Sequence, residues 1–154
     1  MNPNPIPEGF EHATPHLCCT DAAQAIEFYK SAFGATELCR LPMPDGRLGH
    51  AEIKISNAII MLSDEFPEMD ARSPITLGGT PVSTMIYVTD VDAVVAHAVA
   101  GGAKVLEPLK DQFYGDRNCK LSDPAGHVWL FATRKEDLSP AEIKQRMDAM
   151  CATP

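Results

Sequence analysis

The sequence lacks the features of a membrane or secreted protein. No apolar run approaches the roughly 20 residues of a membrane-spanning helix. Residues 1–10 are rich in Pro and Asn, without the apolar stretch of a signal peptide. The five cysteines form no CxxC pair and no zinc-ligand spacing. We therefore expect a cytoplasmic protein in which all five thiols stay reduced.

Positive charge is also scarce. The chain has 13 Lys and Arg against 21 Asp and Glu, a net charge of −8. Sequence-independent binding to nucleic acid depends on basic side chains that neutralise phosphates, and anionic membranes attract basic surfaces in the same way. We therefore expect neither nucleic acid nor membrane as a partner. The 45% hydrophobic content and 154 residues suffice for a globular domain that needs no disulfide or metal to fold.

An internal repeat is the most informative feature that the chain does contain. Thr20-Asp21 opens a helical pattern that ends at Phe33-Gly34, and Thr89-Asp90 opens another that ends at Gly101-Gly102. The markers recur at offsets of about 68 residues, which is too long for a solenoid repeat and indicates a duplicated module. The interface between two such modules is a natural place for a ligand.

Each copy reads as strand, helix and three further strands. Apolar residues at three-to-four spacing predict a helix that Thr20 or Asp21 caps, a second helix is expected over 90–100, and alternation predicts the strands. The expected strands are 13–19, 36–41, 50–56, 58–62, 82–88, 104–108, 118–122 and 128–133. Trp129 and Phe131 fall on one face of the last strand and are expected in the core.

These elements define the expected organisation of the chain. Residues 1–12 read as a flexible N-terminal arm, and residues 13–137 as one domain made of modules 13–65 and 82–136. The polar stretch 66–81, with its Pro and Gly residues, is expected to be the linker. Ser139, Pro140 and Glu142 form a capping box that predicts a helix over 141–150 within a C-terminal tail, 138–154.

The order of elements and motifs resembles the vicinal oxygen chelate superfamily, which includes glyoxalases, bleomycin-resistance proteins and dioxygenases, and within it the PhnB-like branch. The motifs that carry the resemblance are Ala25-Ile26-Glu27-Phe28-Tyr29, Gly49-His50-Ala51-Glu52 and Asp123-Pro124-Ala125-Gly126-His127-Val128-Trp129. The resemblance implies an α+β fold of two βαβββ modules whose sheets form a cup, commonly completed across a homodimer. A single chain with two open-edged sheets favours the same homodimer.

The resemblance also implies where enzymes of the superfamily hold a divalent metal. The four ligand positions fall on Thr14, Met61, Ser83 and Leu130. A transition-metal site is built from imidazole, carboxylate or thiolate, and these four side chains supply none of them. We therefore expect no metal and no other cofactor, which argues against glyoxalase, dioxygenase and fosfomycin-transferase activities.

Other polar residues are candidates for the lining of the cup. His16 shares a strand face with Thr14, and His50 and Glu52 share a face of another strand. His50 and Glu52 could form a half-solvated polar face, contact a ligand, act as an acid/base pair or build a displaced metal site. Cys18 shares the face of His16, and as a nucleophile it would need a lowered pKa.

The second module adds further candidates. Arg117 could hold an anionic group with its planar guanidinium, or it could form an ion pair with Asp116. Phe113 and Tyr114 lie in a predicted loop, where they could line the cup or pack across a dimer. Met85, like Met61, would give the pocket an adaptable apolar wall.

Three functions remain compatible with the sequence. The first is a protein that binds or sequesters a small apolar or aromatic molecule in the cup. The second is a lyase, isomerase or dioxygenase type of enzyme with a non-standard or absent metal site that uses His16, His50, Glu52 and Arg117. The third is a structural dimer whose cup is filled by its own side chains. The residues at the four ligand positions favour the first.

Overall fold

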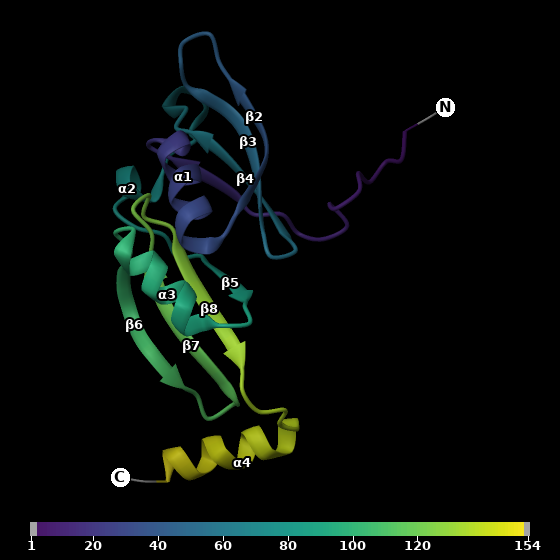
Figure 1. Ribbon diagram of the computed structural model, residues 1–154, viewed down its shortest axis with the longest axis vertical. Helices are drawn as coiled ribbons and strands as arrows, with labels where there is room; N and C mark the ends of the chain where they lie inside the picture. Colours follow the sequence, from purple (N-terminus) through teal and green to yellow (C-terminus); the bar gives the residue numbers. More distant parts are fainter. Residues whose placement is uncertain (1–2, 153–154) are drawn as a thin grey trace.

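A computed structural model describes residues 3–152 of the chain. Two four-stranded sheets follow one another along the long axis of the molecule, with helices packed on one face of each sheet (Figure 1). The α+β class and the two βαβββ modules are confirmed. The two sheets are not closed into one cup within the chain, because each belongs to a single module.

Module one contains a strand, a helix and three further strands. Its strand order is β1-β4-β3-β2, with β1 and β4 parallel and the other pairs antiparallel. Pro15 has no backbone N–H, which explains why β1 starts only after it. The elements are β1 His16–Cys19, α1 Ala22–Phe33, β2 Thr36–Pro42, β3 Leu48–Ile55 and β4 Ala58–Asp64.

Module two repeats this arrangement in the order β5-β8-β7-β6. Its elements are β5 Ser83–Tyr87, α3 Val91–Ala100, β6 Lys104–Asp111, β7 Asp116–Ser122 and β8 Val128–Arg134. Strand β6 runs past Pro108, where the sequence predicts its end. Proline is tolerated there because β6 is an edge strand and its register is irregular between Glu107 and Lys110.

The segment between the modules is more ordered than its composition predicts. It contains a 3-10 helix, η1 Pro67–Met69, and a short helix, α2 Pro74–Leu77. The N–H of Ser73 is donated to Glu65 at 2.6 Å, and Pro74 and Ile75 lie close against Gly126 in the turn before β8. The linker is therefore held against both modules.

Helix α1 forms where its caps and periodicity predict. The Asp21 side chain accepts the backbone N–H of Gln24 at 2.8 Å, and Gly34 ends the helix in the left-handed conformation at φ 65°. One side of the helix supplies seven buried residues, which are Ala22, Ala25, Ile26, Phe28, Tyr29, Ala32 and Phe33. Burial of this side fixes α1 to the sheet of module one.

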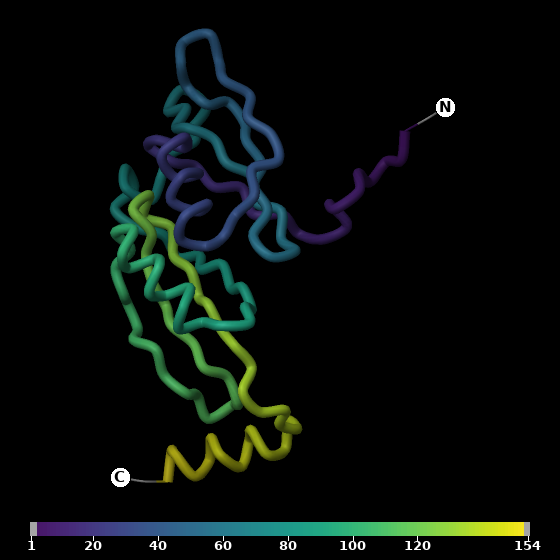
Figure 2. Tube along the Cα trace, in the orientation of Figure 1, coloured from purple at the N-terminus to yellow at the C-terminus, as the bar shows by residue number. Residues whose placement is uncertain are grey.

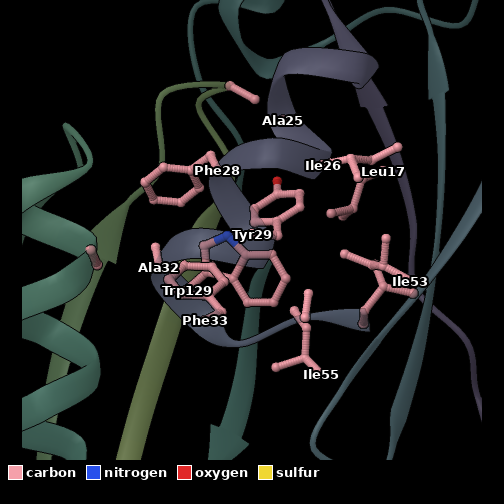
Figure 3. Close-up of a cluster of buried hydrophobic side chains, with 14 of the residues drawn as sticks. Leu17, Ala25, Ile26, Phe28, Tyr29, Ala32, Phe33, Ile53, Ile55 and Trp129 are labelled. Carbon is pink, nitrogen blue, oxygen red and sulfur yellow. The ribbon is translucent and has the colours of Figure 1, made fainter. Parts of the chain in front are cut away.

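The same helix also carries the core that joins the modules. The ring of Phe33 lies 5.2 Å from Trp129 and 4.6 Å from Phe131, both on β8. Figure 3 shows Tyr29, Phe33 and Trp129 gathered around α1. The prediction that Trp129 and Phe131 are core residues is confirmed, since both are fully buried.

The two ends of the described chain differ in structure. Residues 3–15 contain no helix or strand and extend away from the sheets, although Gly9 lies against Ile59 (Figure 2). Helix α4 Pro140–Cys151 has the predicted capping box and buries no residue. Residues 1–2 of the expected arm and 153–154 of the expected tail lie outside the described residues. Within residues 3–152, no helix combines the length and apolarity needed to cross a bilayer.

Candidate functional site

The sheet of module one has one face turned away from the helices, and we call it open face one. The register places His16 beside Met61, Met61 beside Glu52, and Glu52 beside Cys39, in one row across four strands. Residues at alternate positions, such as Ala51, Ile53 and Ile55, are buried under α1 on the other face. Polar and sulfur-containing side chains from four segments are thus gathered on one surface.

His50 and Glu52 form a direct pair on this face. The two residues lie two positions apart on β3, and His50 Nε2 lies 3.1 Å from Glu52 Oε1. Their side chains are 30% and 22% exposed, so the pair is half-buried and still reachable from solvent. The pair can accept and donate protons or hydrogen bonds toward a bound molecule.

His16 lies on the same face at the edge strand β1. Partial desolvation, and then the nearby charge of His50, lower the pKa of the His16 ring. The neutral imidazole is therefore favoured over the imidazolium. It offers one hydrogen-bond donor and one acceptor to a ligand on this face.

Cys39 is the residue of this face that the sequence did not point to. Strand β2 changes register between Glu37 and Cys39, so simple alternation from Thr36 does not tell which face Cys39 occupies. In the structure Cys39 is half-buried, and it belongs with His50 and Glu52 to a group whose ligand atoms lie within 4.8 Å of one another.

Module two has a corresponding uncovered surface, which we call open face two. Met85 pairs with Leu130 as His16 pairs with Met61, and Ser83 and Tyr87 flank Met85 on the same face. On this surface Met85 is 43% and Tyr87 is 49% exposed, and the row of Met85 and Leu130 continues to Lys120 and Glu107. The hydroxyl of Tyr87 is donated to Asp116 Oδ2 at 2.5 Å.

The four positions implied for a superfamily metal do not fit one. Thr14 and Met61 lie on module one, while Ser83 and Leu130 lie on module two. They offer two hydroxyls, a thioether and an alkyl group, none of which is a strong ligand for a transition metal. No step of a reaction can be assigned to a metal at these positions.

Arg117 does not join the other candidates. Its guanidinium donates to both carboxylate oxygens of Asp92 at 2.8 Å and to Asp111 at 3.1 Å. On β7, Arg117 points to the same side of the sheet as the buried Cys119, which is the side packed against α3. Arg117 therefore does not point to open face two. The predicted pairing with Asp116 is also absent from these contacts. Arg117 therefore fastens β7 to the first turn of α3.

Phe113 and Tyr114 lie at the far end of module two. Their rings meet edge to face at 5.1 Å, and the Tyr114 hydroxyl accepts from Asn118 Nδ2 at 2.6 Å. Arg146 of α4 donates to the carbonyl of Phe113. Within the chain, neither residue lies near His50. A role of these rings across a dimer stays a prediction.

Cys18 is a poor candidate for a nucleophile. Burial raises the pKa of its thiol, and the negative charges of Glu65 and Asp64 raise it further. These effects outweigh the nearby N-terminus of α1, so the thiolate is disfavoured.

A groove of about 500 Å³ lies elsewhere, at the junction of the two modules. Asp21, Phe28, Gly101 and Pro124 are among its lining residues. None of the candidate residues named above lines this groove, and the Asp21 side chain already caps α1. The side chains that could act on a bound molecule therefore lie on open face one and not in this groove.

Comparison with known proteins gives a consistent result. A model of the glyoxalase/bleomycin resistance protein/dioxygenase superfamily matches residues 9–131. The uncharacterized protein Mb0911c of Mycobacterium bovis is 43% identical over 139 residues, which cover 88% of this chain and 91% of that protein.

Two solved structures illustrate the likeness in fold. TioX from Micromonospora sp. ML1 aligns with a TM-score of 0.65 at 28% identity, covering 80% of this chain and 98% of TioX. The PhnB protein from Bacillus cereus aligns with a TM-score of 0.62 at 18% identity, covering 80% of this chain and 99% of that one.

Proposed function

Because the chain belongs to the glyoxalase/bleomycin resistance protein/dioxygenase superfamily, we propose that it forms a homodimer that binds or sequesters a small apolar or aromatic molecule. The observation that carries the proposal is open face one, where His16, His50 and Glu52 converge beside Met61 on the sheet surface that is turned away from the helices. A few convergent polar groups among apolar walls are typical of small-molecule sites.

The two sheet faces that are turned away from the helices support the proposed homodimer. Within one chain the sheets lie end to end, so open face two cannot cover open face one (Figure 1). A two-fold axis would let module two of each chain cover module one of the other, closing both faces at once. The exposed apolar side chains Met85 and Tyr87 on face two and Leu41 on face one favour such burial.

The side chains on the two faces indicate the chemical class of the ligand. Met61, Met85 and Leu130 would contact an apolar or aromatic body, and the flexible thioethers suit a loosely defined shape. The His50–Glu52 pair would hold one polar group of the ligand. Arg117 is left out of this site because its guanidinium is already bonded to Asp92 and Asp111.

One observation favours a second candidate, an enzyme. His50 and Glu52 are in hydrogen-bond contact, and such a pair can transfer a proton to or from a bound substrate. Binding is the better-supported function, because the four positions implied for the superfamily metal carry Thr, Met, Ser and Leu. The expected cytoplasmic location, and the absence of nucleic acid and membrane partners, stay predictions.

Light scattering at micromolar concentration tests the homodimer. We expect the mass of two chains for the wild type and of one chain for Met85→Lys, since a buried lysine on face two would be costly. Met150→Lys is the matched control, because Met150 is an exposed methionine of α4, and it should remain dimeric. A wild-type mass of one chain would refute this part of the proposal.

A thermal-shift screen of aromatic metabolites tests the ligand site. Compounds that stabilise the wild type should bind His50→Ala more weakly by about 1 kcal/mol, the worth of one hydrogen bond, or roughly fivefold. His97→Ala, which alters an exposed histidine of α3, should bind normally. Equal stabilisation of all three proteins would place the ligand elsewhere, and a screen without hits from a confirmed dimer would favour a cup filled by side chains.

A further inference from the structure

Three different donor groups meet on open face one. The thiol of Cys39, the imidazole of His50 and the carboxylate of Glu52 bring their ligand atoms within 4.8 Å of one another. All three side chains are half-buried. We call this group the Cys39–His50–Glu52 cluster. A thiolate, an imidazole and a carboxylate are the three side-chain donors that protein zinc sites use.

The backbone holds the cluster in place. Cys39 and Glu52 are direct partners across antiparallel β2 and β3, and His50 lies two residues from Glu52 on the same side of β3. The register change between Glu37 and Cys39 turns the thiol to this side, while the next residue, Arg40, reaches Glu37 and Glu27. Donors on paired strands need little reorganisation to close around an ion.

Among the described residues, no lysine or arginine forms an ion pair with the carboxylate of Glu52. Among residues 3–152, the ion-pair partner of Glu52 is His50 alone. Arg40 is the nearest arginine in sequence, and its charge is taken by Glu37 and Glu27. A half-buried carboxylate beside a thiol and an imidazole is therefore a place where a cation would be held favourably.

We propose that the Cys39–His50–Glu52 cluster binds one divalent transition metal ion of the zinc class. Cys39 Sγ, His50 Nε2 and one Glu52 oxygen would be its ligands, leaving a fourth position open toward face one. Three protein ligands with an open position are the arrangement of zinc sites that accept an exogenous ligand. The thiol proton is released to solvent when the metal binds, so affinity should rise with pH.

This site is distinct from the positions implied by the superfamily. It uses β2 and β3, whereas the superfamily positions Thr14, Met61, Ser83 and Leu130 lie on or beside β1, β4, β5 and β8. The expectation that those four residues bind no metal is unchanged. The proposal goes beyond the small-molecule site, since a metal on one chain requires neither a dimer nor an organic ligand. With the metal bound, the polar group of an organic ligand would meet the open fourth position instead of the free His50–Glu52 pair.

Cobalt titration of the intact, chelator-treated protein tests the proposal, because a thiolate bound to Co²⁺ gives a charge-transfer absorption. We expect the absorption to saturate at one Co²⁺ per chain and to be displaced by Zn²⁺. Cys39→Ser should abolish the charge-transfer absorption, and His50→Ala and Glu52→Gln should each weaken binding by about tenfold or more. Cys151→Ser and His97→Ala remove an exposed thiol and an exposed imidazole elsewhere, and both should titrate like the wild type.

The outcomes separate cleanly. A charge-transfer absorption that persists in Cys39→Ser, or its absence from the wild type, overturns the proposal. Circular dichroism checks the fold of each variant, and Glu52→Gln, which keeps the side-chain volume, decides the question if Cys39→Ser does not fold. Because the titration uses metal alone, its failure would leave the light-scattering and thermal-shift tests unaffected.

Discussion

At the scale of single residues, the carboxylate of Asp123 is the most heavily used polar group of the core. It accepts from the Tyr29 hydroxyl at 2.6 Å, from the Trp129 indole at 2.7 Å and from the backbone N–H of His127 at 2.9 Å. Asp123 is buried in the turn before β8, and Tyr29 comes from α1. One side chain thus links the two modules.

Removal of this carboxylate should be costly. Asp123→Ala would leave a buried hydroxyl and a buried indole N–H without their acceptor, so we expect the free energy of unfolding to fall by about 2–5 kcal/mol. Urea denaturation followed by circular dichroism measures the change. Asp137→Ala, which removes a side chain that is 91% exposed, should change it by less than about 0.5 kcal/mol. A loss below about 1 kcal/mol for Asp123→Ala would show that water replaces the acceptor.

The sequence predicts which candidate residues share a face of the sheet only where the strand alternates regularly. His50 and Glu52 lie on one regular stretch of β3, so their shared face follows from the sequence. Cys39 follows a register irregularity, and Arg117 is captured by Asp92 from a helix 25 residues earlier. Neither placement can be obtained from local alternation, because both depend on contacts between distant segments.

At the scale of elements, two helices have similar caps and very different packing. Asp21 caps α1, which buries seven residues, and Ser139 caps α4, which buries none. A cap contributes about 1 kcal/mol to the helix that it starts. Whether this contribution reaches the whole protein depends on whether the helix unfolds together with the core.

This difference gives a paired prediction. Asp21→Ala should lower the free energy of global unfolding by about 1 kcal/mol, because α1 is part of the core. Ser139→Ala should leave it within about 0.5 kcal/mol and instead speed hydrogen exchange in α4. Urea unfolding and amide exchange measured by mass spectrometry distinguish the two effects. Equal losses of global stability in both variants would mean that α4 is packed against something, such as a second chain.

The elements themselves were largely predictable. The caps at Asp21, Gly34 and Ser139 act as the sequence indicates, because capping is a local interaction. Asp90, which the sequence places inside its helix, is the cap of α3. The short helices of the linker were not foreseen, since η1 and α2 are set by the contacts of Ser73 and Ile75 with Glu65 and Gly126. Strand ends shifted where proline or an edge position changed the hydrogen-bonding pattern.

At the scale of the whole molecule, the modules share one aromatic core. Phe33 of module one meets Trp129 and Phe131 of module two, and Tyr29 lies 5.4 Å from Trp129. The repeat in the sequence predicted two modules but not how their sheets face each other. That arrangement is decided by the contact between α1 and α3 and by these rings, none of which has a local signature.

We expect that neither module folds alone. A chain of residues 82–154 would expose Trp129, the single tryptophan, to water, so the tryptophan fluorescence of this fragment should be red-shifted. The fragment should also show no cooperative unfolding transition. Addition of residues 1–81 should shift the emission to shorter wavelength. The fragment 1–81 with Phe33→Ala lacks the ring that packs against Trp129, so a higher concentration of this fragment should be needed for the same shift in emission. A cooperative transition of residues 82–154 alone would contradict a shared core.

The parallel pairing of β1 with β4 also governs what happens during synthesis of the chain. Strand β1 leaves the ribosome first among the strands, yet its hydrogen-bonding partner is the last strand of its module. The backbone of β1 therefore stays without its hydrogen-bonding partner until β4 has been synthesised. The ring of Phe33 stays without its packing partners until synthesis reaches Trp129 and Phe131 on β8. During this interval the apolar side chains of the nascent module are exposed, and such transiently exposed surface is what chaperones bind.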